Sequence, residues 1–225
     1  MSLRFARRGA PVRAEEVAQR RGNMSLHVEN AVAPTTGRAE VARLVSAIIH
    51  PIVFPLITLG IALYAVTDSL PDAARWVALA LLLTTIPVSL LVAVQVLRGA
   101  WTDLDVSVRR QRYLLYPFGL ACMLFLAVTY RRFDAPTIAI RITLAIVLAN
   151  LCGALINLRY KVSAHASGAA ICATVLFTVS AIGGLIGSLA ALLVGWSRIE
   201  LRRHTRGQVL LGWSVGIAST LVMLH

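Results

Sequence analysis

Lysine, cysteine and acidic residues are scarce in this sequence. Lys161 is the only lysine among 22 basic residues, and the chain has three cysteines and 10 acidic residues. The cysteines lie within apolar runs, where they behave as small hydrophobic residues; they are Cys122, Cys152 and Cys172. Their spacing gives neither a disulfide framework nor a set of metal ligands, so redox chemistry and metal binding by cysteine have no support.

Apolar residues dominate what is present. Hydrophobic residues make up 58% of the chain, charged residues only 14%, and the mean hydropathy is +0.76. Such a chain cannot cover itself with a polar surface in water, so we expect an integral membrane protein in contact with the lipid bilayer. The net charge of +12 fits anionic lipid head groups better than nucleic acid, which we do not expect as a partner.

The first 40 residues differ from the rest. Eight arginines occur up to Arg43, with prolines and glycines between them, and there is no sustained apolar run. The segment also lacks the apolar core of a signal peptide. We therefore divide the chain into a basic N-terminal tail, residues 1–40, and a transmembrane domain, residues 41–225. The tail is expected to be disordered or to lie on the membrane surface as a short amphipathic helix.

Long apolar runs fill the second part of the chain. A spanning helix needs roughly 20 apolar residues, and the runs that qualify are 44–66, 75–98, 113–130, 136–158 and 207–224. The stretch 165–197 is too long for one straight crossing at about 1.5 Å per residue, which predicts two short helices broken near Gly183 and Gly184. The predicted fold class is all-α, a polytopic transmembrane helical bundle of about six to seven spanning helices.

Basic residues are unevenly distributed between the two sides of such a bundle. With seven crossings, the side that carries the N-terminal tail receives all 22 basic residues except Arg75, Arg131, Arg132 and Arg141. Because cytoplasmic loops carry the excess of lysine and arginine, we predict a cytoplasmic N-terminus. The membrane is expected to be a cell membrane.

Three polar clusters emerge on one face of this bundle. They are residues 103–112, 159–168 and 197–208, and an even number of crossings separates each from the next. All three are therefore predicted to meet at one site on the cytoplasmic side. Ionisable groups at membrane depth are costly and often mark functional positions.

Two histidines in these clusters suit phosphate-ester cleavage. In the third cluster Gln208 lies four residues after His204, so it can hydrogen-bond and orient the histidine ring, and Arg198 offers a planar fork of donors to phosphate oxygens. In the second, Ser163 is a predicted helix N-cap, which places His165 in the first helical turn, where backbone amides attract anions. One imidazole can attack phosphorus while the other protonates the leaving oxygen.

These residues resemble the phosphatidic acid phosphatase type 2 superfamily of membrane lipid phosphatases, in a divergent bacterial branch. The third motif of that family is Ser-Arg, five residues, His, three residues, Asp; here it reads Ser197-Arg198, then His204, then Gln208. Its Pro-Ser-Gly-His motif corresponds to Val162-Ser163-Ala164-His165. The resemblance implies that His204 is the nucleophile, that His165 is the general acid, and that Arg198, Ser163 and the amide of Ala164 bind phosphate. It implies no metal and no organic cofactor.

The chain departs from the family at two places. Gln208 replaces the aspartate of the third motif, so it can orient His204 but supplies no negative charge to stabilise an imidazolium. Another carboxylate could substitute; the candidates are Asp103, Asp105 and Glu200. The family's first motif, Lys, six residues, Arg-Pro, is absent as such, and its phosphate-binding cations are expected to be Arg109, Arg112 and Lys161.

The sequence therefore predicts a membrane-embedded phosphatase that hydrolyses a lipid or polyprenyl phosphate, or a pyrophosphate, through a phosphohistidine intermediate. The alternatives are a catalytically weakened lipid-phosphate binding protein and an accessory subunit of a membrane complex. His50, beside Pro51 and Pro55, is assigned a structural place at a kink in the first helix rather than a catalytic one. Three other arginines are assigned to a head-group-binding face: Arg202, Arg203 and Arg206. The small residues Gly184, Gly187 and Gly195 permit close helix packing within one bundle or between subunits, so the oligomeric state stays open.

Overall fold

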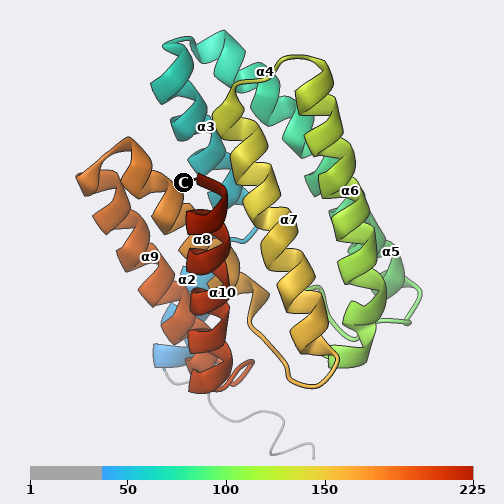
Figure 1. Ribbon diagram of the computed structural model, residues 1–225. Helices are drawn as coiled ribbons and strands as arrows, with labels where there is room; N and C mark the ends of the chain where they lie inside the picture. The colour runs from blue at the N-terminus through green and yellow to red at the C-terminus, as the bar shows by residue number, and fades with distance from the viewer. Residues whose placement is uncertain (1–36, 225) are drawn as a thin grey trace, which may run out of the picture. The chain divides into compact units, whose positions relative to one another are not determined.

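The computed structural model describes residues 37–224, so the predicted basic tail lies, up to residue 36, outside the described residues. Every regular element within the described part is a helix, which confirms the all-α fold class. The elements are α2 (Gly37–Ile48), α3 (Val53–Thr67), α4 (Leu70–Ala80), a π-helical turn (Leu81–Thr85), α5 (Ile86–Leu97), a 3-10 turn (Arg109–Gln111), α6 (Arg112–Arg132), α7 (Thr137–Asn157), α8 (Ala164–Val179), α9 (Ala181–Glu200) and α10 (Arg206–Leu224). From Val41 onward they belong to one compact unit (Figure 1).

Five helices in the described part are long and apolar enough to cross a membrane. They are Leu70–Leu97, Arg109–Arg132, Thr137–Asn157, Ala181–Glu200 and Arg206–Leu224, and a sixth candidate is the bent pair formed by α2 and α3. Helix α8 is apolar but has only 16 residues. These helices fit an integral membrane protein, with five or six long candidate spans and α8 as the shorter seventh apolar element.

The first apolar run is bent as the prolines predict. Helices α2 and α3 meet at an angle of 43°, across the residues 49–52. His50 lies in this bend, where its ring Nδ1 accepts a hydrogen bond from the backbone N–H of Ile52 at 3.2 Å. His50 therefore lies at the predicted kink.

The predicted break near Gly183 and Gly184 is wrong by a few residues. Helix α8 ends at Val179, and Ser180 has the extended backbone of a helix cap, with its side chain accepting a hydrogen bond from the N–H of Gly183 at 2.9 Å. A serine N-cap supplies an acceptor that glycine lacks, so the new helix starts at Ala181. Gly184 lies inside the first turns of α9, against Phe177 of α8.

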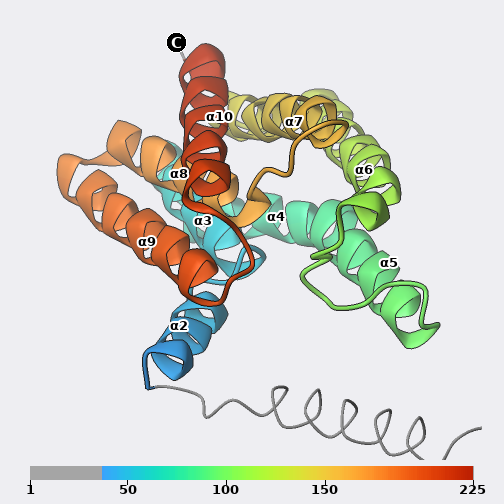
Figure 2. The same ribbon diagram turned by 90° about the horizontal axis from the view of Figure 1, so that it is seen from below.

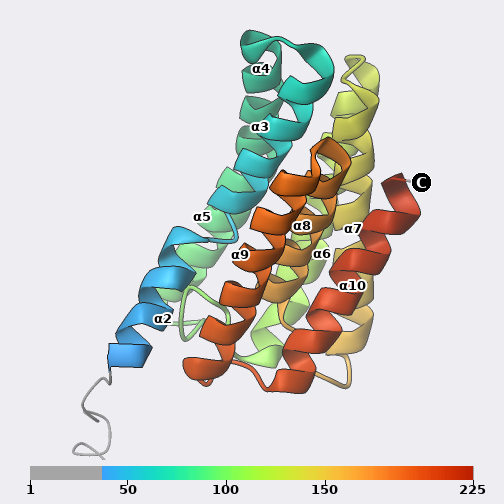
Figure 3. The same cartoon turned by 90° about the vertical axis from the view of Figure 1, so that its left-hand side faces the viewer.

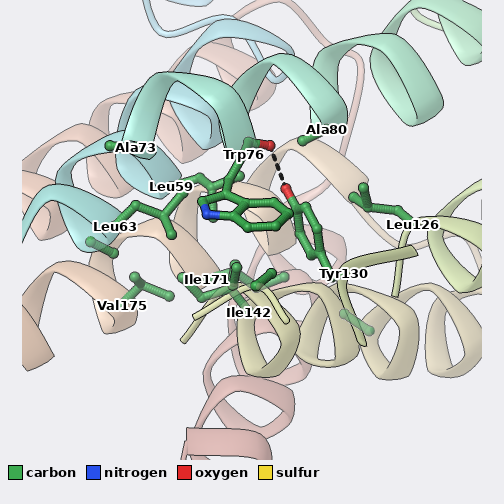
Figure 4. Close-up of a cluster of buried hydrophobic side chains, with 14 residues drawn as sticks. Leu59, Leu63, Ala73, Trp76, Ala80, Leu126, Tyr130, Ile142, Ile171 and Val175 are labelled. Atoms are coloured by element: carbon green, nitrogen blue, oxygen red, sulfur yellow. Dashed lines mark hydrogen bonds between the residues drawn. The ribbon is translucent and has the colours of Figure 1, made fainter. Parts of the chain in front are cut away.

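A hydrophobic core joins α3, α4, α6, α7 and α8 at the end of the bundle opposite the polar clusters. Its centre is Trp76, whose ring meets the ring of Tyr130 edge-on at a centroid distance of 5.7 Å (Figure 4). The hydroxyl of Tyr130 donates a hydrogen bond of 2.6 Å to the backbone carbonyl of Trp76. A buried tyrosine needs such a partner, and this contact fixes α6 against α4.

Small residues let α8 approach its neighbours closely. Helices α8, α9 and α10 lie side by side (Figure 3). A Cβ atom added to Gly212 of α10 would lie 2.6 Å from the backbone oxygen of Ser163, and one added to Gly187 of α9 would lie 2.9 Å from the Cα of Ala173. These glycines therefore serve packing within one chain, as small residues do at membrane helix interfaces.

Candidate active site

Three loops meet at one end of the bundle: 98–111 after α5, which includes the 3-10 turn, 158–163 after α7, and 201–205 after α9 (Figure 2). Each pair is joined by hydrogen bonds. Arg109 donates to the backbone oxygen of Leu158 at 3.1 Å, Arg203 donates to the hydroxyl of Ser107 at 3.0 Å, and Lys161 donates to the backbone oxygen of Arg203 at 2.9 Å. The predicted convergence of the three polar clusters is thus confirmed.

His204 is buried where the third loop turns back on α9. Its backbone N–H donates to the carbonyl of Arg198 at 3.1 Å, and the residue is only 6% exposed. Burial, together with the positive charges of Lys161 and Arg112, lowers the pKa of His204 to about 3. The imidazole is therefore neutral near pH 7, which is the state that a nucleophilic nitrogen requires.

The hydrogen bonds of Gln208 fix which nitrogen of His204 carries the proton. Its side-chain oxygen lies 3.1 Å from Nδ1 of His204 and also accepts the backbone N–H of Thr205 at 3.3 Å. A backbone N–H can only donate, so the atom between the two is the amide oxygen, and Nδ1 of His204 must donate to it. The proton is thus on Nδ1, and the lone pair is on Nε2.

Gln208 also has a structural role, in capping α10, that sequence reasoning did not predict. Helix α10 begins at Arg206, two residues after His204, so His204 lies in the loop before the helix. Thr205 occupies the N-cap: its hydroxyl accepts the N–H of Gln208 at 3.4 Å while the Gln208 side chain accepts the N–H of Thr205. This reciprocal pair of hydrogen bonds is a capping box. It fixes the backbone at Thr205 and so the position of His204, the residue just before the cap.

The start of α8 forms the second wall of the site. Ser163 is the N-cap, as predicted, and its hydroxyl accepts the N–H of Ala166 at 3.3 Å. Its backbone N–H donates to the carbonyl of Gln208 at 3.2 Å, so the starts of α8 and α10 are held together. Ser163 is fully buried and Ala164 is exposed, while His165 lies in the first turn. An anion here would face the free amides of the helix N-terminus.

Arg198 lies buried at the centre of the site with a side chain only 2% exposed. One terminal nitrogen donates to the hydroxyl of Ser46 at 3.2 Å, and the other to the carboxylate of Asp105 at 2.8 Å. Its Nε is buried and has no partner among the described residues. The second carboxylate oxygen of Asp105 lies 3.6 Å from Nε2 of His165. Asp105 therefore links Arg198 to His165.

The structure shows what two of the carboxylates proposed as partners of His204 contact instead. Asp105 contacts Arg198 and His165, so its predicted place as a substitute partner of His204 is wrong. Asp103 is occupied within its own loop, where it accepts hydrogen bonds from the hydroxyls of Thr102 at 2.9 Å and Ser107 at 3.0 Å. The oxygen that faces His204 is that of Gln208.

The three cations predicted to replace the first motif tie the loops together. Arg112 is buried and donates to the carbonyls of Val106 at 2.8 Å and Val162 at 2.9 Å. Arg109 and Lys161 likewise donate to backbone carbonyls of neighbouring loops. Burial and the nearby charge of Arg112 lower the pKa of Lys161. The contact of all three with phosphate stays a prediction, but the charges of Lys161 and Arg112 act on His204.

Sequence reasoning missed two residues near the site. Ser46 on α2 reaches Arg198 because the first run is bent. Asn157, fully buried at the end of α7, donates to the carbonyl of Arg109 at 3.3 Å, while its side-chain oxygen has no partner among the described residues. Within a long apolar run, a lone serine or asparagine gives no signal of such a place.

A cavity of about 820 Å³ opens between α8, α9 and α10. Its lining is mostly apolar and includes Phe177, Leu192, Trp213 and Ile217.

Within residues 37–224 there is no group of three or more His, Cys, Asp or Glu side chains that could hold a metal ion. Comparisons with family models, with curated proteins and with solved structures found no match to this chain.

Proposed function

We propose that this protein is a membrane-embedded, metal-independent phosphatase of the phosphatidic acid phosphatase type 2 kind. The observation that carries the proposal is the state of His204, which is buried, neutral and hydrogen-bonded through Nδ1, so that the lone pair on Nε2 is available for attack. The convergence of Arg198 and His165 with its loop supports it further.

The proposed reaction has two steps. Nε2 of His204 attacks phosphorus and the bond from phosphorus to the leaving oxygen breaks, while the imidazolium form of His165 gives a proton to that oxygen and becomes neutral. Water then attacks the phosphohistidine, the bond from phosphorus to nitrogen breaks, and His165 takes the proton of the water. In both steps the cations Arg198 and Lys161 and the α8 backbone amides stabilise the negative charge on the phosphoryl oxygens. Nδ1 keeps its proton, which stays hydrogen-bonded to Gln208.

The proposed substrate is a lipid or polyprenyl phosphate or pyrophosphate. The site lies at one end of a bundle of apolar helices, where a phosphate head group of a membrane lipid would lie. The cavity between α8, α9 and α10 is apolar enough to accommodate a hydrocarbon tail from the bilayer. The excess of basic residues at the same end supports a cytoplasmic site in a bacterial cell membrane.

A second candidate is a protein that binds lipid phosphate without cleaving it. Two observations favour it: Gln208 supplies no charge to His204, and Asp105 is paired with Arg198. The test is phosphate release from a panel of prenyl and glycerolipid phosphates by the purified full chain in detergent, with a chelator present. Turnover supports the phosphatase. Tight binding of the same lipids without turnover would replace it with the binding protein.

A further inference from the structure

The carboxylate of Asp105 lies between the two residues to which a phosphate ester is expected to bind. One oxygen is 2.8 Å from a terminal nitrogen of Arg198 and the other is 3.6 Å from Nε2 of His165. In the proposed reaction Arg198 binds a phosphoryl oxygen and His165 faces the leaving oxygen. A carboxylate and a phosphate compete for an arginine because both offer paired oxygen acceptors to its planar fork of donors.

From this placement we propose that Asp105 is an internal competitor of phosphate, which occupies the phosphate position in the free protein and returns to it when product leaves. The inference rests on the proposed function and concerns the affinity of the same site. Asp105 would then set the affinity of the site for substrate and for inorganic phosphate. The buried Nε of Arg198, which has no partner among the described residues, is a donor left for a ligand that the carboxylate does not reach.

The loop that carries Asp105 is held in a strained conformation. Val106, the next residue, has a φ of +48°, which is unusual for a β-branched side chain, and it is buried. Its carbonyl accepts the Arg112 guanidinium at 2.8 Å, and its N–H donates to the carbonyl of Asp103 at 3.1 Å. A strained residue that the surrounding contacts enforce is often linked to function, and here the strain aims Asp105 at Arg198.

Asp105 is also in the right charge state to compete. Burial alone would raise the pKa of its carboxyl group, but the charge and the hydrogen bond of Arg198, with smaller contributions from His165 and Arg203, lower it. The side chain is still 32% exposed, whereas that of Arg198 is 2% exposed. Asp105 is therefore an ionised group on the open side of the pair, and it can move away without uncovering the rest of the site.

The first experiment compares Asp105→Asn with wild type as full-length protein in detergent. Titration calorimetry with inorganic phosphate and with orthovanadate is expected to give about tenfold tighter binding, since removing a competitor restores the fraction of sites open to ligand. The KM should fall with it. Release of product phosphate becomes slower, so kcat should fall where release limits turnover and stay unchanged where chemistry does. Asp103→Asn removes the same charge from the same loop but leaves the Arg198 partner in place, and it should not tighten binding.

The outcomes separate this inference from the proposed function. Binding that is unchanged or weaker in Asp105→Asn, in protein that still hydrolyses lipid phosphate, would overturn the inference alone and make Asp105 a support for Arg198. Failure of wild type and variant alike to bind phosphate or vanadate would overturn both.

A second measurement needs no variant. Carbodiimide labelling of Asp105 in wild-type protein, read by mass spectrometry, should increase several-fold with vanadate over chloride at matched ionic strength, because vanadate displaces the carboxylate. Unchanged or reduced labelling would overturn the inference.

Discussion

Nδ1 of His204 lies 3.1 Å from the side-chain oxygen of Gln208, and the same oxygen accepts the N–H of Thr205, the N-cap of α10. One side chain therefore orients the proposed nucleophile and caps the helix that follows. Gln208→Ala should lose both functions. We expect a cost of about 1–3 kcal/mol in transition-state stabilisation for the lost hydrogen bond and about 0.5–2 kcal/mol in stability for the lost cap. Phosphate release and thermal unfolding in detergent measure the two losses separately.

Gln208→Asp tests the missing negative charge. The pKa of His204 is about 3 in the native protein, and a carboxylate at position 208 stabilises the imidazolium, so that pKa should rise. The rate at pH 7 should be kept or raised, because charge on the ring develops in the transition state. The acid side of the pH profile of kcat/KM should move to higher pH, since a protonated ring cannot attack. A large rate loss with an unmoved profile would argue against Gln208 as the partner of the nucleophile.

His204→Ala should abolish turnover, with a loss on the order of 10³-fold or more, because a covalent route has no substitute for its nucleophile. Rapid quenching of wild type with radiolabelled substrate should trap an acid-labile, base-stable phosphoenzyme that the variant does not form. Size-exclusion chromatography and thermal unfolding serve as controls for folding. If the variant keeps more than a small residual rate, His204 is not the nucleophile.

His165→Ala should act through the leaving group. The loss should be about 10²- to 10⁴-fold for alkyl phosphates, whose leaving oxygen needs a proton, and far smaller for p-nitrophenyl phosphate, which needs little. The measurement is kcat/KM for a series of esters that differ in leaving-group pKa. Equal losses across the series would indicate that His165 binds phosphate but does not protonate the leaving oxygen.

Hydropathy was sufficient to predict the helices, because the runs at 113–130, 136–158 and 207–224 end within a few residues of α6, α7 and α10. The break between α8 and α9 was misplaced since a serine cap and a glycine pair give competing signals, and the cap prevailed at Ser180. Motif spacing likewise brought His204, His165 and Arg198 into one region.

The partners of the charged residues could not be predicted in the same way. Arg112 donates to carbonyls of two loops, and Asp105 faces Arg198 because Val106 turns the backbone. Both facts depend on where the loop backbones run after the helices have packed. A sequence shows which residues carry charge near the site but not which carbonyl or guanidinium lies opposite.

The side of the membrane can be tested with single cysteines. Cys122 and Cys152 are partly accessible, so a background without native cysteines comes first. Arg206→Cys lies at the end that carries the site, and Asp134→Cys lies in the loop between α6 and α7 at the other. A membrane-impermeant maleimide applied to intact cells should label position 134 and spare position 206, and permeabilised cells should show both. The reverse pattern would place the site outside the cytoplasm.

Close contact of α8 with α10 should be essential to the site, because it holds Ser163 beside Gln208. In Gly212→Ala the new Cβ would lie 2.6 Å from the backbone oxygen of Ser163, a contact that neither helix can relieve without moving. We expect a loss of about 1–3 kcal/mol in stability from overpacking, together with weaker vanadate binding. Gly168→Ala, on α8 itself, is the matched control: its Cβ meets nothing within 4 Å, so the variant should be as stable as wild type or slightly more so. If the two variants unfold at the same temperature and bind vanadate equally, the register of α8 on α10 does not shape the site.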